Sequence, residues 1–217
     1  MEKTVIKDTI FDNSWDLVCK IYLSRFPTSP YFPMLLNHEL SSISWDVNNQ
    51  IFHCEKRSTM YLPVPAVLRR LANVDHCYVF QSMTIDLKKQ IMTEFSMTRQ
   101  NSKTYCLKED AEWKSSDENK TAFHEVSSFT LTSKLPKIMR KLVMKKIVEN
   151  YEEGYSTARE VDSLIKDYVN SKQQTLLESI KDFCQRQNDH QQLNTTFSFD
   201  SSFDLSFNLP PMSGKYI

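Results

Sequence analysis

Apolar residues recur along the chain with two periods, and each period predicts one kind of element. Between residues 15 and 26 they lie three or four positions apart, which predicts a helix with one apolar face. Elsewhere apolar and polar residues alternate, which predicts antiparallel strands joined by polar turns. The expected strands cover residues 3–10, 39–45, 50–59, 78–87, 91–99, 104–113 and 121–132, and the more apolar face of 91–99 carries Ile91, Thr93, Phe95 and Met97.

A much longer helical stripe follows the last strand. It runs from about residue 136 to 169, and its apolar positions include Ile138, Met139 and Leu142. About 34 residues at 1.5 Å each would span about 50 Å, enough to cross a whole sheet. The order of elements predicts an α+β fold in which a curved antiparallel sheet grips one long C-terminal helix. Between sheet and helix, the pattern leaves open either a filling of aromatic side chains or an enclosed apolar ligand.

Composition divides the chain into three parts. Residues 1–170 carry the strand and helix patterns and form the expected domain, and a weaker helical stripe over 171–186 predicts an extension of the long helix. Residues 187–217 are polar and predict a disordered tail. The repeated phenylalanines of that tail fit either a short partner-binding motif or a passive end.

Several functional classes lack their signatures in this sequence. The 27 basic residues balance 27 acidic ones, so no charge excess indicates a nucleic-acid partner. The five cysteines form no CxxC pair, the five histidines are scattered and only two glycines occur, so we expect no metal site, no cofactor and no enzyme. No apolar run reaches the roughly 18 residues of a membrane span, and neither a secretory signal nor an arginine-rich presequence is visible.

Two basic features could meet an anionic ligand or surface. Arg25 ends the first helix and enters a loop stiffened by three prolines, RFPTSPYFP. A fixed cation beside an apolar wall could hold an anionic head group, but it could equally cap the helix or pair with an acid. The second feature, SKLPKIMRKLVMKK, fits either membrane docking or a solvated helix face. Its docking candidates are Lys134, Lys137, Arg140, Lys141 and Lys145.

The segment SWDLVCKIYLSRFPTSPYFPM resembles the opening helix and loop of PRELI domains, whose hallmark is R-[FY]-P-x-x-P. The similarity continues through EKRS, LRRLANVDHCYVF, AEW and VENYEEGY, over about residues 1–170. In motif it is most similar to the PRELI domain of CRAL-TRIO and GOLD-domain lipid-binding proteins, although we expect no such domain to follow here. The resemblance implies a START-like fold that encloses a lipid pocket.

The resemblance also implies site residues. Arg25, Arg57 and Lys146 match cationic positions that contact the lipid head group, and three converging cations could bind a phosphate. Where the family often has two lysines, this chain has Glu152 and Glu153, which favours a less anionic lipid or a larger share of the binding for Arg25. The short helix expected at 62–74 takes the place of the family's lid, with Val67, Leu68, Arg69, Arg70 and Leu71 at its centre.

Two functions follow from the resemblance. The first is a phospholipid-transfer protein that carries a lipid of the phosphatidic acid or phosphatidylserine class between membranes. It would act at membrane surfaces in the mitochondrial intermembrane space, with a small helical partner that has twin cysteine motifs. The second is a cytosolic lipid-sensing or adaptor module without transfer activity. Transfer between donor and acceptor liposomes would separate the two.

Overall fold

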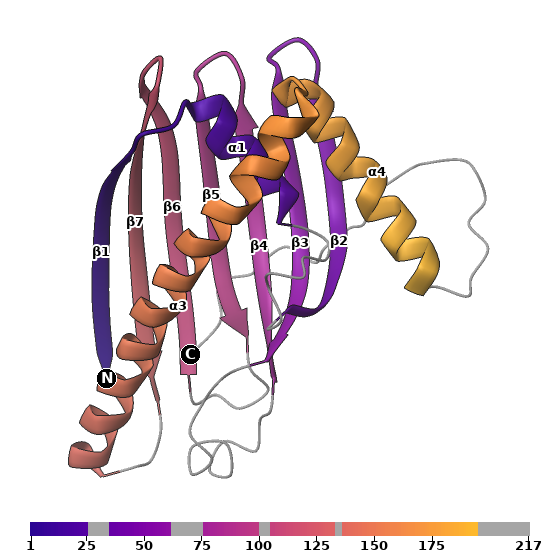
Figure 1. Cartoon of the computed structure of the whole chain (residues 1–217). Coiled ribbons are helices and arrows are strands. Elements are labelled where there is room, and N and C mark those ends of the chain that lie inside the picture. Colours follow the sequence, from indigo (N-terminus) through magenta and orange to yellow (C-terminus); the bar gives the residue numbers. More distant parts are fainter. Residues whose placement is uncertain (26–34, 62–75, 100–104, 133–135, 195–217) are drawn as a thin grey trace.

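The computed structural model describes residues 1–25, 35–61, 76–99, 105–132 and 136–194, and its centre is one curved antiparallel sheet (Figure 1). The sheet has seven strands in the order β1-β7-β6-β5-β4-β3-β2. Strands that lie side by side are therefore also consecutive in the sequence, with the exception of the pair β1 and β7. This meander confirms the strand alternation predicted above. The strands are β1 (Glu2–Phe11), β2 (Leu35–Asp46), β3 (Ile51–Tyr61), β4 (His76–Asp86), β5 (Ile91–Arg99), β6 (Tyr105–Asp117) and β7 (Lys120–Leu131).

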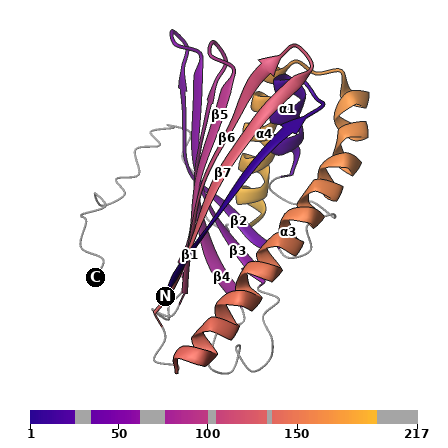
Figure 2. The ribbon, with the colours of Figure 1, turned by 90° about the vertical axis from the view of Figure 1, so that its left-hand side faces the viewer.

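The three described helices lie on one face of this sheet, which we call the inner face (Figure 2). They are α1 (Trp15–Ser24), α3 (Lys137–Lys172) and α4 (Leu176–Asn194). Helix α3 crosses the sheet diagonally, while α1 and α4 cover the end where the hairpins β2–β3 and β4–β5 turn (Figure 1). The predicted α+β fold, a curved antiparallel sheet that grips a long C-terminal helix, is therefore confirmed. The expected short helix at 62–74 lies outside the described residues.

The main apolar core fills the inner face under α1 and α4. It joins side chains of both helices to the ends of β3, β4 and β5 next to their turns. Helix α4 belongs fully to this core, since Leu176, Ile180 and Phe183 are all buried in it. The other buried members are Trp15, Cys19, Tyr22, Leu23, Phe52, Cys54, Met83, Ile85 and Met92.

Two smaller clusters hold α3. Ile21 of α1 packs against Val161, Ile165 and Val169 in the carboxyl-terminal half of α3. At the other end of the sheet, Phe129 and Leu131 of β7 pack against Met144 and Val148. These two clusters lie at opposite ends of the inner face. The middle of the sheet therefore belongs to neither cluster.

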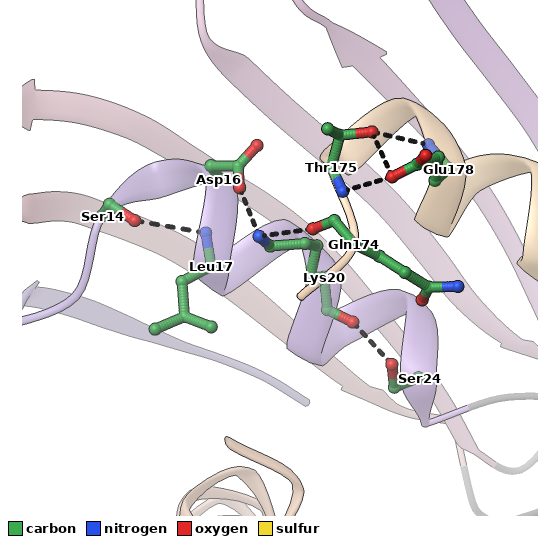
Figure 3. A network of polar contacts seen from close by, with 8 residues as sticks. All are labelled: Ser14, Asp16, Leu17, Lys20, Ser24, Gln174, Thr175 and Glu178. Carbon is green, nitrogen blue, oxygen red and sulfur yellow. Dashed lines mark hydrogen bonds and ion pairs between the residues drawn. The ribbon is translucent and has the colours of Figure 1, made fainter. Parts of the chain in front are cut away.

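Polar contacts join α1 to the turn between α3 and α4 (Figure 3). Lys20 Nζ donates a hydrogen bond to the carbonyl of Gln174 at 3.1 Å and lies 2.6 Å from Asp16 Oδ2. Helix α4 begins with a capping box: the Thr175 amide donates to Glu178 Oε2 at 2.7 Å, and the Glu178 amide donates to Thr175 Oγ1 at 3.3 Å. The capping box fixes where α4 begins, and the bond from Lys20 to Gln174 holds that start beside α1.

The structure corrects three expectations. On β5 the face with Phe95 and Met97 is not the inner one, because the buried side chains are those of Met92, Ser96 and Thr98. Helix α4 is separate from α3 and continues to Asn194, past residue 186 where we expected the helical extension to end. The tail from residue 195 lies outside the described part of the chain. The third correction concerns three apolar residues of the α3 stripe, which face solvent and not the sheet: Ile138, Met139 and Leu142.

Candidate functional site

A band of polar side chains crosses the inner face between the two apolar ends of the sheet. Its members come from six strands and are in register, so that each lies beside the next across the sheet. Alternation of side chains along each strand turns all of them toward the helices. We call this set the polar belt: Lys7, Lys56, Gln81, Glu94, Ser96, Glu109, Glu125 and Ser127.

Lys56 is the fully enclosed cation of the belt, with no solvent-exposed side-chain surface. Its Nζ donates to the hydroxyl of Tyr22 on α1 at 3.0 Å and lies 3.5 Å from Glu94 Oε2. Burial, with a smaller contribution from the nearby charge of Arg25, lowers the pKa of Lys56 to about 7. The side chain can therefore gain or lose its charge near neutral pH.

Arg25 is a second cation that contacts Tyr22. The Tyr22 ring centroid is 5.1 Å from Arg25 Cζ and 4.7 Å from Lys56 Nζ, so the ring contacts both cations. Arg25 also binds Asp162 of α3, with Nε donating to Oδ1 at 2.8 Å and Nη2 donating to Oδ2 at 2.5 Å. The structure thus confirms the interpretation that Arg25 pairs with an acid, and it also places Arg25 close to a second, buried cation.

Burial shifts the pKa of three carboxyl groups of the belt upward, toward the neutral form. Burial raises the pKa of Glu109 to about 7, and burial also raises the pKa of Glu94 and of Glu125. Ser96 Oγ donates to Glu109 Oε2 at 2.5 Å, and Gln81 Nε2 donates to Glu94 Oε1 at 2.8 Å. A protonated carboxyl can donate as well as accept, so the belt can present several donors to one ligand.

At the β1 edge the belt meets two tyrosines of α3. Lys7 Nζ lies 4.0 Å from the ring centroid of Tyr151 and 3.5 Å from that of Tyr155. The Tyr151 hydroxyl lies 2.6 Å from Ser127 Oγ. Burial lowers the pKa of Lys7. The rings of Tyr151 and Tyr155 on α3 therefore cover the belt at its β1 edge.

Within the described part of the chain, two buried atoms of the belt make neither a hydrogen bond nor an ion pair, Lys7 Nζ and Glu125 Oε2, and a third, Glu94 Oε2, makes no hydrogen bond but lies 3.5 Å from Lys56 Nζ. Buried polar atoms are nearly always satisfied, by protein or by a bound molecule. The belt is thus a polar surface with spare hydrogen-bonding capacity between two apolar clusters. That chemistry suits an amphiphilic ligand with a polar head and an apolar remainder.

The other two predicted head-group residues do not join Arg25. Arg57 follows Lys56 on β3, so its side chain leaves the strand on the outer face. There it is 44% exposed, donates to Glu39 of β2 and lies 6.0 Å from the ring of Tyr78. Lys146 is exposed on α3 and lies 3.5 Å from Glu149 Oε2. Sixteen residues separate Lys146 from Asp162, about 24 Å of helix, so the structure does not bring Lys146 to Arg25.

The remaining predicted positions divide into described and undescribed residues. Lys137, Lys141 and Lys145 are exposed in the first turns of α3, and Arg140 is half-buried beside them. The docking residue Lys134 and the five expected lid residues lie outside the described part of the chain: Val67, Leu68, Arg69, Arg70 and Leu71. Their roles stay predictions.

The polar belt itself was missed at the level of sequence. In strands, alternating Lys, Glu, Gln and Ser residues are the usual mark of a solvent-facing side, and here they mark the inner face. The EKRS segment offered two adjacent cations, and only the parity of the strand decides that Lys56 and not Arg57 points inward. In the described residues no three His, Cys, Asp or Glu side chains are placed to hold a metal ion. Among them, too, no helix is both long and apolar enough to cross a membrane.

Known proteins resemble this chain in part. A CRAL-TRIO domain-containing protein of Caenorhabditis elegans, T23G5.2, is 21% identical over 199 residues, which cover 90% of this chain and 26% of that protein. Protein real-time of Drosophila melanogaster is 26% identical over 84 residues, which cover 39% of this chain and 13% of that protein. The chain therefore spans about a quarter or less of the length of these relatives.

Solved structures resemble the fold at low identity. The Zhui aromatase/cyclase from Streptomyces sp. R1128 has a TM-score of 0.48 and 10% identity, with 77% of this chain and 94% of that chain covered. A START superfamily protein from Mycobacterium smegmatis has a TM-score of 0.41 and 12% identity, with 74% of this chain and 98% of that chain covered.

A family model gives the assignment. The model of the PRELI-like family matches residues 16–172, from the second residue of α1 to the last residue of α3. This range includes β2 to β7, and with them every strand of the polar belt except β1. Since the match covers well over half of the chain and ends where α3 ends, the chain belongs to the PRELI-like family.

Proposed function

We propose that this protein binds one phospholipid molecule between the inner face of its sheet and α3, and carries it between membranes without chemical change. Membership of the PRELI-like family and the START-like fold support lipid binding. The observation that carries the proposal is the pair of cations that contact the Tyr22 ring: Arg25, which is mostly buried, and Lys56, which is fully buried. A cationic pair beside buried apolar surface fits a phosphate head group with acyl chains attached.

The polar belt and the apolar clusters would contact different parts of such a ligand. Lys56 and the neutral form of Glu109 offer donors to phosphate or ester oxygens. Apolar side chains of β7 and α3 offer surface to the acyl chains. We retain a phospholipid of the phosphatidic acid or phosphatidylserine class as the proposed cargo. Glu152 and Glu153 are exposed on α3 and add no cation, so Lys56 supplies the second positive charge.

Further parts of the proposal rest on family resemblance. We propose action at membrane surfaces in the mitochondrial intermembrane space, with the cytoplasm as the alternative. A small helical partner with twin cysteine motifs is proposed on the same ground. Arg57 and Lys146 are exposed and lie away from Lys56. They would contact a head group only where the ligand extends out of the interior to the surface.

A second candidate function is lipid sensing without transfer. The similarity to the Caenorhabditis elegans CRAL-TRIO domain-containing protein, which covers 90% of this chain, favours it. In that case the domain would hold its lipid and report on it to other parts of a larger assembly.

Two measurements test the proposal. Native mass spectrometry of the purified chain should show one phospholipid per protein, and fluorescent phospholipid should move from donor to acceptor vesicles when the protein is added. Lipid that is retained without transfer would favour the sensing function. If no phospholipid co-purifies and added phospholipid gives no thermal shift, lipid binding is refuted.

A further inference from the structure

The first turns of α3 place large apolar side chains on the surface of the molecule. Ile138 is 76% exposed, Leu142 is 64% exposed and Met139 is 43% exposed. Positions 138 and 142 lie one turn apart, so they form one ridge, with Met139 beside it. The side of the helix that packs on the sheet is a different one and carries Met144 and Val148. The exposed ridge is therefore not a part of the core.

Cations surround this ridge. Lys137, Lys141 and Lys145 are exposed, and no acidic residue occurs between Lys134 and Val148. The nearest acid, Glu149, lies 3.7 Å from Lys145 Nζ and 3.5 Å from Lys146 Nζ, at the far end of the basic stretch. An apolar ridge with a basic border is the pattern of a helix that lies in the interface of an anionic membrane.

The start of α3 adds a second reason for an anionic partner. Its N-cap is Pro136, which makes no side-chain capping bond, and the first turn holds no acidic residue. Cations in this position oppose the positive end of the helix dipole. By contrast, α1 has Ser14 as its cap and Asp16 in its first turn. Phosphate groups of a bilayer would offset this repulsion.

The position of these turns leaves them accessible. In both views α3 begins at one extreme end of the molecule, close to the start of β1 and away from α1 and α4 (Figures 1 and 2). The described helices α1 and α4 therefore do not cover these turns.

We infer that residues 137–145 of α3, which we call the docking turns, hold the protein on an anionic phospholipid bilayer by inserting Ile138, Met139 and Leu142 among the acyl chains. The lysines attract the surface, and the apolar ridge supplies the contact that persists when salt screens the charges. Insertion of apolar side chains distinguishes a bilayer from a nucleic acid, for which the lysines alone would suffice. The inference rests on the proposed function, because it names the surface at which the lipid would be exchanged.

Vesicle flotation with the full chain tests the inference. The probe is a vesicle of phosphatidylcholine mixed with phosphatidylglycerol, with pure phosphatidylcholine vesicles for comparison. The double variant I138S/L142S keeps every cation and should bind the anionic vesicles about tenfold more weakly. The variant L142K gains a charge and loses an apolar side chain, so it should also bind more weakly than the wild type at high salt.

The matched control is L164S/Y168S. These residues are 56% and 54% exposed on the same helix, away from the basic stretch, and their loss should leave vesicle binding unchanged. Circular dichroism confirms folding of each variant. The inference is overturned if I138S/L142S binds like the wild type, if L142K binds more tightly at high salt, or if the control loses binding equally. Self-association of the wild type through the ridge, detected by light scattering, would also overturn it.

Failure of this inference is distinguishable from failure of the proposed function. A variant that keeps its co-purified lipid but no longer floats with vesicles supports the docking turns. If the wild type floats and contains no lipid, docking stands and the proposed lipid cargo fails. If the wild type contains lipid and does not float, docking fails and lipid binding stands.

Discussion

Arg25, at the end of α1, binds both carboxylate oxygens of Asp162, in the carboxyl-terminal half of α3. The side chains are 19% and 16% exposed, so the pair is mostly shielded from water. This bond ties α3 to α1 at the point where Arg25 also contacts Tyr22. The same guanidinium therefore has a structural partner and a position beside the proposed head-group site.

Exchange of the two charges should separate these roles. The single variants R25D and D162R each leave like charges facing one another, and each should lower the free energy of unfolding by about 2 to 3 kcal/mol. The double variant R25D/D162R should recover at least half of that loss in urea denaturation, and strictly additive losses would contradict the pairing. Recovered stability with persistently low lipid content would show that the guanidinium must stand on α1 to contact the ligand.

Adjacent residues on β3 offer a matched test of the interior. Lys56 faces the helices and Arg57 faces outward, so K56M and R57M remove one cation each from opposite faces of one strand. We expect K56M to lower the phospholipid content measured by mass spectrometry at least several-fold, and R57M to leave it close to the wild-type value. A larger effect of R57M would place the head group outside the polar belt.

Lipid binding should depend on pH through Lys56. Burial, and the nearby charge of Arg25, lower its pKa to about 7, and an anionic head group would raise that pKa again. Affinity should therefore be highest below pH 7 and fall as the pH rises above 7, with proton uptake on binding. Calorimetry in two buffers of different ionisation enthalpy measures that uptake. K56M should show none, and an uptake that survives in K56M would assign it to another group.

Glu109 should make stability depend on pH in a defined direction. Burial raises its pKa from 4.5 to about 7, so its neutral form stabilises the fold below pH 4.5 and this contribution is lost as the pH rises through 7. The variant E109Q lacks this loss. Its stability relative to the wild type should therefore increase between pH 4.5 and 7.5, on the order of 2 to 3 kcal/mol. E112Q, exposed on the same strand, serves as the control, and an unchanged difference for E109Q would contradict the burial argument.

Helix α4 should contribute strongly to stability. Phe183 is fully buried and its ring centroid lies 6.2 Å from that of Phe52, whereas Leu177 on the same helix is 40% exposed. We expect F183A to cost about 3 to 5 kcal/mol and L177A less than about 1 kcal/mol in chemical denaturation. Equal small losses would mean that α4 is only loosely attached.

The strands and the long helix were predictable because periodicity decides them. The alternation over 121–132 and the stripe over 136–169 leave little choice of element, and both match β7 and α3 closely. The face of each element was harder to predict. On β5 the apolar face with Phe95 turns outward, and on α3 the apolar residue Ile138 faces solvent.

The candidate site could be predicted only in part. Arg25 was found because a helix end and a proline loop fix its place, but its partner Asp162 is 137 residues away and no local pattern links them. Lys56 could not be distinguished from Arg57 without the strand register. The start of α4 did have a signal, since Thr175 and Glu178 form a capping-box pattern that our reading did not use.

The described fold extends beyond both ends of the range that the family model matches. Strand β1 precedes the match and completes one edge of the sheet with Lys7, while α4 follows it and covers Trp15 and Phe52. A fragment cut to residues 16–172 would expose the β7 edge to pairing with other chains, and it would expose the part of the main apolar core that α4 covers. Such a fragment should aggregate, so a study of this domain in isolation has to keep residues 1–194 together.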